Sequence, residues 1–133
     1  MDKETHSLSF AVRDYELDLQ GIVNNAVYQN YLEHARHEFL KAHGLDFNQL
    51  HLDGYDAVVV RSEIDYKRSL QSGNRFEVIT RVEREGRLRI VFHQDIVRTD
   101  DGQTILKARI LTACIYKNRP VEPLLILEKL GLI

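Results

Sequence analysis

Residues 15–31 of this 133-residue chain read YELDLQGIVNNAVYQNY, and this stretch decides how the rest of the sequence is interpreted. An irregular loop with one central carboxylate, Asp18, changes there to a helical pattern that begins at Asn24. Gly21 lies between them and is free to adopt the positive φ of a tight turn. This order predicts an ionised side chain beside a helix N-terminus, where backbone N–H groups are unpaired and the helix dipole is positive.

The helix is predicted to run from Asn24 to about residue 43. Asn24 is a favoured N-cap residue, and Gly44 is a natural residue just beyond the C-terminus. Apolar residues recur at helical spacing and form one broad stripe. The stripe consists of Tyr28, Tyr31, Leu32, Ala35, Phe39 and Leu40.

Strands are predicted on both sides of this helix, because apolar and polar residues alternate there. One short strand precedes the helix, at residues 8–12. After a loop at residues 46–55, four long strands are expected at residues 57–68, 74–84, 87–99 and 103–117, with Pro120 and Pro123 ending the last one. The residues of the first long strand that are expected to face the core are Val58, Val60, Ile64 and Tyr66.

The resulting β-α-β-β-β-β order predicts a single α+β domain over residues 1–133. One helix of about four turns cannot cover both faces of such a sheet, so we expect the sheet to curl around the helix. Its open edges would be hidden by pairing with a second copy. The protein is therefore expected to be a homodimer or a homotetramer.

Composition excludes several classes of partner and location. A net charge of −2 gives no electrostatic basis for binding nucleic acid or an anionic membrane. No apolar run approaches the roughly 20 residues that a membrane span needs. The single cysteine, Cys114, fits a reducing compartment, and the first residues lack the apolar core of a signal peptide. We therefore expect a cytoplasmic protein.

Asp18 is the leading candidate for a catalytic group. The loop around it is apolar rather than polar, so its carboxylate is expected to be partly removed from water, where its pKa and reactivity are adjustable. The first turn of the helix, chiefly the backbone N–H of Asn25, would stabilise a developing oxyanion. The alternative is a structural Asp18 that only caps a turn.

Other reactive residues form no comparable pattern. Glu33 is either a residue on the flank of the helix, paired with a neighbouring cation, or a catalytic acid. His34 and His37 are three residues apart, but no cysteine or carboxylate set completes a metal site. A Gly-x-Ser-x-Gly nucleophile motif and a phosphate-binding glycine-rich loop are both absent from the sequence.

Residues 18–28, DLQGIVNNAVY, followed by EHAR at residues 33–36, resemble the active-site loop and helix start of hotdog-fold acyl-CoA thioesterases. The resemblance is to the 4-hydroxybenzoyl-CoA thioesterase-like family. The Val-Asn-Asn-x-x-Tyr portion is also similar to plant acyl-acyl carrier protein thioesterases. The predicted order of helix and strands is the hotdog order, in which a curled antiparallel sheet wraps around one long helix.

This resemblance implies an acyl-CoA thioesterase that needs no cofactor and no metal. Asp18 matches the catalytic carboxylate, which acts as nucleophile or as general base. Asn25 matches the residue whose backbone N–H polarises the thioester carbonyl, and Gly21 matches the turn glycine. Possible substrate-pocket residues are Ile22, Val23, Asn24, Tyr28 and Glu33, and possible contacts to the CoA phosphates are Lys67, Arg68, Arg87 and Arg89.

Two positions differ from relatives that carry histidine there, namely Ile22 and Asn25. The absence of a histidine at position 22 argues against a hydratase, which needs a proton shuttle, and leaves a mechanism based on aspartate alone intact. Two alternatives remain. One is a hotdog thioesterase that uses Glu33 as the catalytic acid, and the other is a non-catalytic module that binds acyl-CoA or an acyl carrier.

Overall fold

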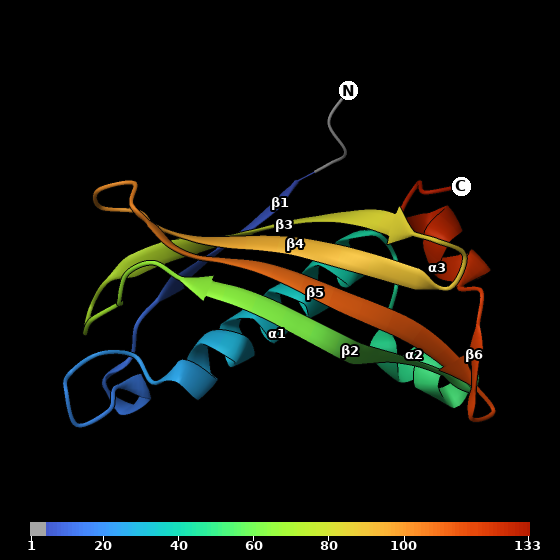
Figure 1. The fold of residues 1–133 in the computed structure, drawn as a ribbon, viewed down its shortest axis with the longest axis horizontal. Helices are drawn as coiled ribbons and strands as arrows, with labels where there is room; N and C mark the ends of the chain where they lie inside the picture. Colours follow the sequence, from blue (N-terminus) through green and yellow to red (C-terminus); the bar gives the residue numbers. More distant parts are fainter. Residues whose placement is uncertain (1–4) are drawn as a thin grey trace.

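The computed structural model describes residues 5–133 as one antiparallel sheet that curls around helix α1, Asn25–Ala42 (Figure 1). The strand order is β1-β3-β4-β5-β2, and β6 pairs with β5. This is the predicted α+β hotdog arrangement, and the prediction is confirmed. The strands are β1 His6–Ala11, β2 Tyr55–Tyr66, β3 Arg75–Glu85, β4 Arg89–Arg98, β5 Thr104–Tyr116 and β6 Arg119–Val121.

Helix α1 begins and ends as its sequence predicts. The side chain of Asn24 accepts a hydrogen bond from the Ala26 N–H at 2.9 Å, which is an N-cap. Gly44 follows the last turn with a φ of 78°, a conformation that glycine adopts without a steric cost. The whole predicted apolar stripe is buried, from Tyr28 to Leu40.

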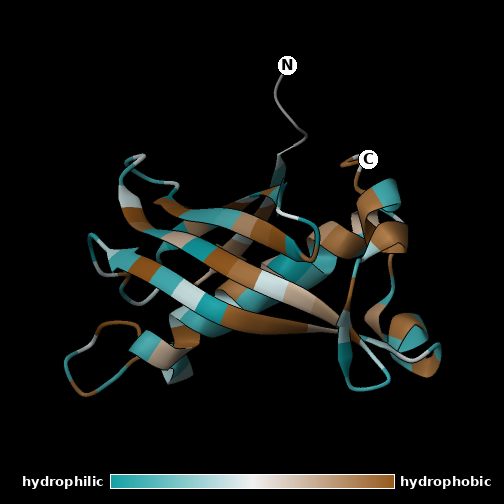
Figure 2. Cartoon of the chain, turned by 45° about the vertical axis from the view of Figure 1, so that its right-hand side comes forward, coloured by the Kyte–Doolittle hydropathy of each residue, from teal (hydrophilic) through white to brown (hydrophobic). Residues whose placement is uncertain are grey.

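The core lies between this stripe and the concave face of the sheet. Inward-facing residues of β3, among them Phe76 and Val78, are fully buried. Aromatic contacts join the helix to the sheet, with ring centroids 4.7 Å apart for Tyr31 and Phe76. Figure 2 shows hydrophobic and hydrophilic residues alternating along the strands, as a sheet with one buried face requires.

The predicted core face of β2 is partly wrong. A β-bulge lies between Val59 and Arg61 and shifts the register against β5 by one residue, Val60. Before the bulge, Ala57 and Val59 therefore line the space beside α1, while Val58 points to the convex face. Residues 57–60 are all apolar, so the sequence there fits either register and does not reveal the extra residue. After the bulge, Ile64 and Tyr66 face α1 as predicted.

Two short α-helices were not predicted, nor was the single 3-10 turn η1, Asp14–Glu16, that follows β1. Helix α2, Phe47–Leu52, occupies the expected loop at residues 46–55, and helix α3, Leu124–Lys129, lies near the C-terminus. Six residues are too few to establish a helical period, which explains why sequence periodicity misses both. None of the helices within residues 5–133 has the length and apolar character needed to cross a membrane.

The last long strand also ends differently from the prediction. Strand β5 stops at Tyr116 because Lys117 and Asn118 adopt positive φ angles of 49° and 65° and reverse the chain. The returning strand β6 contains Pro120, which was expected to end the previous strand. Proline is tolerated there because β6 is a short strand at the periphery of the sheet.

One edge of the sheet is open along β2, since within residues 5–133 this strand pairs only with β5. Three consecutive valines of this edge strand, Val58 to Val60, are 39%, 48% and 44% exposed. An edge strand with unpaired backbone groups and exposed apolar side chains is a template for pairing with another strand.

The N-cap gives a first prediction. Replacing Asn24 by alanine should lower the free energy of unfolding by about 1 kcal/mol, because the Ala26 N–H loses its acceptor. Urea unfolding at a fixed protein concentration measures the change. Asn30→Ala, at an exposed position within α1, is the control and should cause no loss, since alanine favours helix. If both variants lowered the free energy of unfolding equally, Asn24 would not act as an N-cap.

Candidate active site

The loop between β1 and α1 folds back on itself and places Asp18 close to the start of the helix. Leu17 and Val23 form an antiparallel bridge across the loop. Next to this bridge the Asp18 N–H donates to the Ile22 carbonyl at 2.8 Å, and the Gly21 N–H donates to the Asp18 carbonyl at 3.1 Å. Gly21 has a φ of 79° with open space around it, so the glycine serves the turn itself.

The Asp18 carboxylate is half-buried and only partly engaged. Its Oδ1 accepts a hydrogen bond from the Gln20 N–H at 2.8 Å. Its Oδ2 makes no hydrogen bond to residues 5–133. Burial raises the pKa of the nearby Tyr28 hydroxyl, and the charge of Asp18 adds a smaller increase to that pKa. One carboxylate oxygen is thus fixed by the turn, and the other is available to a ligand.

The first turn of α1 has one backbone donor that capping does not use. Asn24 takes the Ala26 N–H with its side chain and the Val27 N–H with its carbonyl, both at 2.9 Å. The N–H of Asn25, the first helical residue, donates to none of residues 5–133. Asn25 is exposed, so this donor at the positive end of the helix dipole is open to a substrate oxygen.

A buried carboxylate that sequence reasoning missed ties the loop to the helix. Glu16 Oε1 accepts from the Tyr31 hydroxyl at 2.7 Å and from the Arg13 N–H at 2.8 Å. Its backbone carbonyl accepts from the Asn24 N–H at 3.1 Å. Burial raises the pKa of Glu16, but the hydrogen bonds from Arg13 and Tyr31 outweigh it and hold this pKa below its usual value. No sequence pattern links residues 16 and 31.

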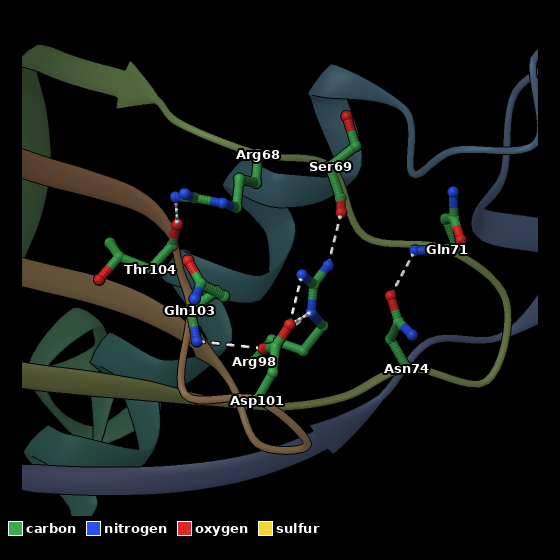
Figure 3. Close-up of polar contacts among 8 residues, drawn as sticks. All are labelled: Arg68, Ser69, Gln71, Asn74, Arg98, Asp101, Gln103 and Thr104. Carbon is green, nitrogen blue, oxygen red and sulfur yellow. Dashed lines mark hydrogen bonds and ion pairs between the residues drawn. The ribbon is translucent and has the colours of Figure 1, made fainter.

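A second support comes from the segment that follows β2. The Leu70 N–H donates to the Tyr28 hydroxyl at 2.9 Å, so this segment packs against the first turns of α1. Arg98 holds the segment from β4, because it pairs with Asp101 at 2.8 Å and donates to the Ser69 carbonyl at 3.2 Å (Figure 3). The site loop is therefore fixed from the helix side by Glu16 and from the sheet side by Leu70.

The structure brings together most, but not all, of the predicted pocket residues. Ile22 is half-buried, and Val23 and Tyr28 are buried in the core beneath the loop. Glu33 lies eight residues beyond Asn25, about 12 Å along the helix axis. It borders a separate cleft between α1 and β2. Among residues 5–133 no three His, Cys, Asp or Glu side chains are grouped to hold a metal ion.

The four cations proposed for CoA phosphates fall into two groups. Lys67 and Arg68 are exposed and follow β2 directly, at the end of the sheet that carries the Asp18 loop. Arg68 donates to the Thr104 carbonyl at 3.5 Å (Figure 3). Arg87 and Arg89 lie at the opposite end, between β3 and β4. Within one chain the four residues do not form a cluster.

The chain matches a known family over most of its length. Residues 20–105 match the model of the Thioesterase superfamily. The chain therefore belongs to the thioesterase superfamily, as its sequence predicts. Acyl-acyl carrier protein thioesterase ATL2, chloroplastic, of Arabidopsis thaliana is 40% identical over 104 residues, which are 78% of this chain and 55% of the relative.

A second relative and two solved structures are similar to this chain. A putative esterase of Aquifex aeolicus is 32% identical over 80% of this chain and 81% of its own. A hypothetical protein of Aquifex aeolicus has a TM-score of 0.87 with 28% identity, covering 94% and 98% of the two chains. DHNA-CoA thioesterase of Staphylococcus aureus has a TM-score of 0.82, covers 89% and 80%, and at 22% identity shows a shared fold. The chain spans little more than half the length of ATL2.

The lowered pKa of Glu16 gives a prediction with a defined sign. A carboxyl whose folded-state pKa is below its usual value of 4.5 stabilises the fold above that pH, and the stabilisation is lost as the pH falls through the lower folded-state pKa. Glu16→Gln should therefore lower the free energy of unfolding by about 1–3 kcal/mol at pH 7 and by less at pH 3.

Urea unfolding at the two pH values measures this difference. Glu128→Gln, at an exposed position of α3, is the control and should behave like wild type at both. If Glu16→Gln lowered the free energy of unfolding by the same amount at pH 3 and pH 7, the charge of Glu16 would not stabilise the loop.

Proposed function

We propose that this protein is an acyl-CoA thioesterase, which hydrolyses an acyl-CoA to a free carboxylic acid and CoA. The proposal rests on two neighbouring groups that make no hydrogen bond to residues 5–133, one on the fixed loop and one at the start of α1. These are the second oxygen of the Asp18 carboxylate and the backbone N–H of Asn25 at the helix N-terminus. Membership in the thioesterase superfamily supports the reaction class.

The carboxylate of Asp18 acts on the acyl carbon in one of two ways. As a nucleophile it forms an acyl-aspartyl anhydride, which water then hydrolyses. As a general base it takes a proton from the water that attacks the thioester. In either case the C–S bond breaks, the thiolate of CoA leaves and takes up a proton, and the acyl group gains the oxygen of water.

The N–H of Asn25 stabilises the transition state by donating to the carbonyl oxygen as negative charge develops on it. Such a donor is effective because the protein holds it in place before the reaction begins. Asn24 supplies this fixation, since its side chain and carbonyl bind the next two N–H groups of the turn. A backbone donor needs no histidine at position 25, where this chain has asparagine.

An acyl group on an acyl carrier protein is a second candidate substrate. The plant relatives ATL2 and ATL3 are named acyl-acyl carrier protein thioesterases, although this chain covers only 55% and 63% of their lengths. Both carriers present the same thioester on a pantetheine arm, so the groups at Asp18 serve either.

We also propose a homodimer, or a tetramer built from it, because the β2 edge is open. The cytoplasmic location stays a prediction.

Asp18→Asn is expected to lower kcat by about two orders of magnitude or more, because the neutral amide is neither nucleophile nor base. Release of free thiol from a panel of aliphatic and aromatic acyl-CoAs measures the rate. Glu33→Gln tests the rival carboxylate on the same substrate, at a protein concentration where both variants have the same assembly state. A large loss in Glu33→Gln with near-normal hydrolysis in Asp18→Asn would assign the reaction to Glu33.

A binding module without turnover predicts a different result for the unmodified protein. An acyl-CoA would then raise its melting temperature, because the ligand binds only the folded state, and no thiol would be released. This outcome across the whole acyl-CoA panel, and with acyl carrier protein thioesters, would remove the catalytic proposal.

The positions of the cations give a separate prediction about CoA recognition. Replacing both Lys67 and Arg68 by alanine should raise KM for acyl-CoA about tenfold, since charge-assisted contacts to phosphate are lost, with little change in kcat. The matched control is the same acyl group on a pantetheine that lacks the nucleotide, whose KM should not change. Equal increases for both substrates would mean that these residues do not contact the phosphates.

A further inference from the structure

Arg36 is a buried cation that lacks a counter-charge. Its side chain lies on α1, and the residue is only 9% exposed. It makes no ion pair with residues 5–133, and its one hydrogen bond runs from Nη1 to Gln94 Oε1 at 3.0 Å. Burial lowers the pKa of Arg36, and the charge of Glu33 opposes this only in part. A buried guanidinium whose single hydrogen-bond partner is neutral carries a charge that nothing compensates, which is unfavourable.

Gln94 fixes this arrangement from the sheet. It is fully buried in β4, and its Nε2 donates to the Leu32 carbonyl and to Thr80 Oγ1, both at 3.0 Å. Because both amide hydrogens are committed, its oxygen must face Arg36. The guanidinium is therefore held in one place by a neutral acceptor that cannot compensate its charge.

The remaining nitrogens of Arg36 reach the surface of a cleft between α1 and β2. Within residues 5–133 only His6 has a side-chain nitrogen that is both buried and unpaired, so the unbonded nitrogens of Arg36 are accessible. The cleft has a volume of about 280 Å³, and Val59 and Ile64 line its β2 side. The helix face that carries Arg36 forms its other side, and Ile110 of β5 also borders it.

Glu33 is the complementary charge on this face. It precedes Arg36 by three residues on α1, lines the same cleft and is exposed. It makes no ion pair with residues 5–133, and its charge acts on Arg36 and His37 only through space. One helix face thus carries an unpaired anion and an unpaired cation side by side, both next to an open edge strand.

We infer that Arg36 forms an ion pair with Glu33 of a second copy of this chain, and that the same pair forms twice across a two-fold axis. A two-fold interface brings the same surface of both chains together, so a surface that carries both charges is self-complementary. The inference concerns assembly and does not depend on the reaction that the protein catalyses.

Two observations favour a second copy over a small anion as the occupant. Val59 belongs both to the open edge of β2 and to the wall of the cleft, so a strand that pairs with this edge also covers the cleft. A free anion beside Arg36 would also lie next to the negative charge of Glu33. In a two-fold assembly, by contrast, each carboxylate faces a guanidinium and no charge is left unpaired.

Mixed dimers of two single variants test the inference. Chains with Glu33→Gln and chains with Arg36→Met are co-expressed with different tags, and native mass spectrometry measures the proportions of the dimers. Each pure dimer would contain two unpaired charges of one sign. The mixed dimer retains one Arg36–Glu33 pair and places the two substituted side chains opposite each other. The ratio of the mixed dimer to either pure dimer, which is about two for random pairing of equal amounts, should rise about fivefold.

An ion pair within one chain gives no such preference, so random proportions would overturn the inference. The control mixes His34→Gln with Glu38→Gln, which disrupt a pair 3.9 Å apart within one helix, and it should give random proportions. Glu33→Gln alone provides a second measurement that does not disturb Gln94. Its dimer dissociation constant, from analytical ultracentrifugation, should rise about tenfold. An unchanged constant, or a monomeric wild type, would contradict the inference.

Discussion

The structure around the candidate site depends on the attachment of the β1–α1 loop to the helix. Glu16 provides this attachment by binding three residues, since its carboxylate accepts from Tyr31 and Arg13 and its carbonyl accepts from the Asn24 N–H. Its burial would be unfavourable without these donors. Because Asn24 is the N-cap of α1, the same residue fixes both the loop and the first turn of the helix. The position of Asp18 relative to the Asn25 N–H follows from that constraint.

This attachment matters for chemistry because electrostatic stabilisation of a transition state requires groups that are already in place. A loop with an exposed apolar tip, such as Leu19, would otherwise be mobile. Here the loop is held from the helix by Glu16 and from the sheet by Leu70, which binds the Tyr28 hydroxyl. The polar network around Arg98 in turn holds the segment that contains Leu70. Rigidity at the site is thus built from residues that take no part in the proposed reaction.

Sequence alone predicted the features that are local and periodic. The helix and its cap at Asn24 were correct, because capping and apolar spacing act over a few residues. The sequence did not reveal the bulge at Val60, since in a run of three consecutive valines either register puts an apolar residue on the core face. It also missed the bond between Glu16 and Tyr31, because a pairing over 15 residues exists only once the loop has folded back. For the candidate site, the sequence supplied candidate residues whose roles stay predictions, and it did not supply the contacts that hold the loop in place.

The division of the proposed CoA contacts into two groups has a physical consequence for the proposed dimer. Lys67 and Arg68 share one end of the sheet with Asp18, whereas Arg87 and Arg89 lie at the other end. When two β2 strands pair antiparallel about a two-fold axis, the ends of the two chains are reversed relative to each other. The partner's Arg87 and Arg89 then lie at the end that carries Asp18 here. In the proposed dimer, the proposed CoA contacts of the two chains would therefore share one end of the continuous sheet.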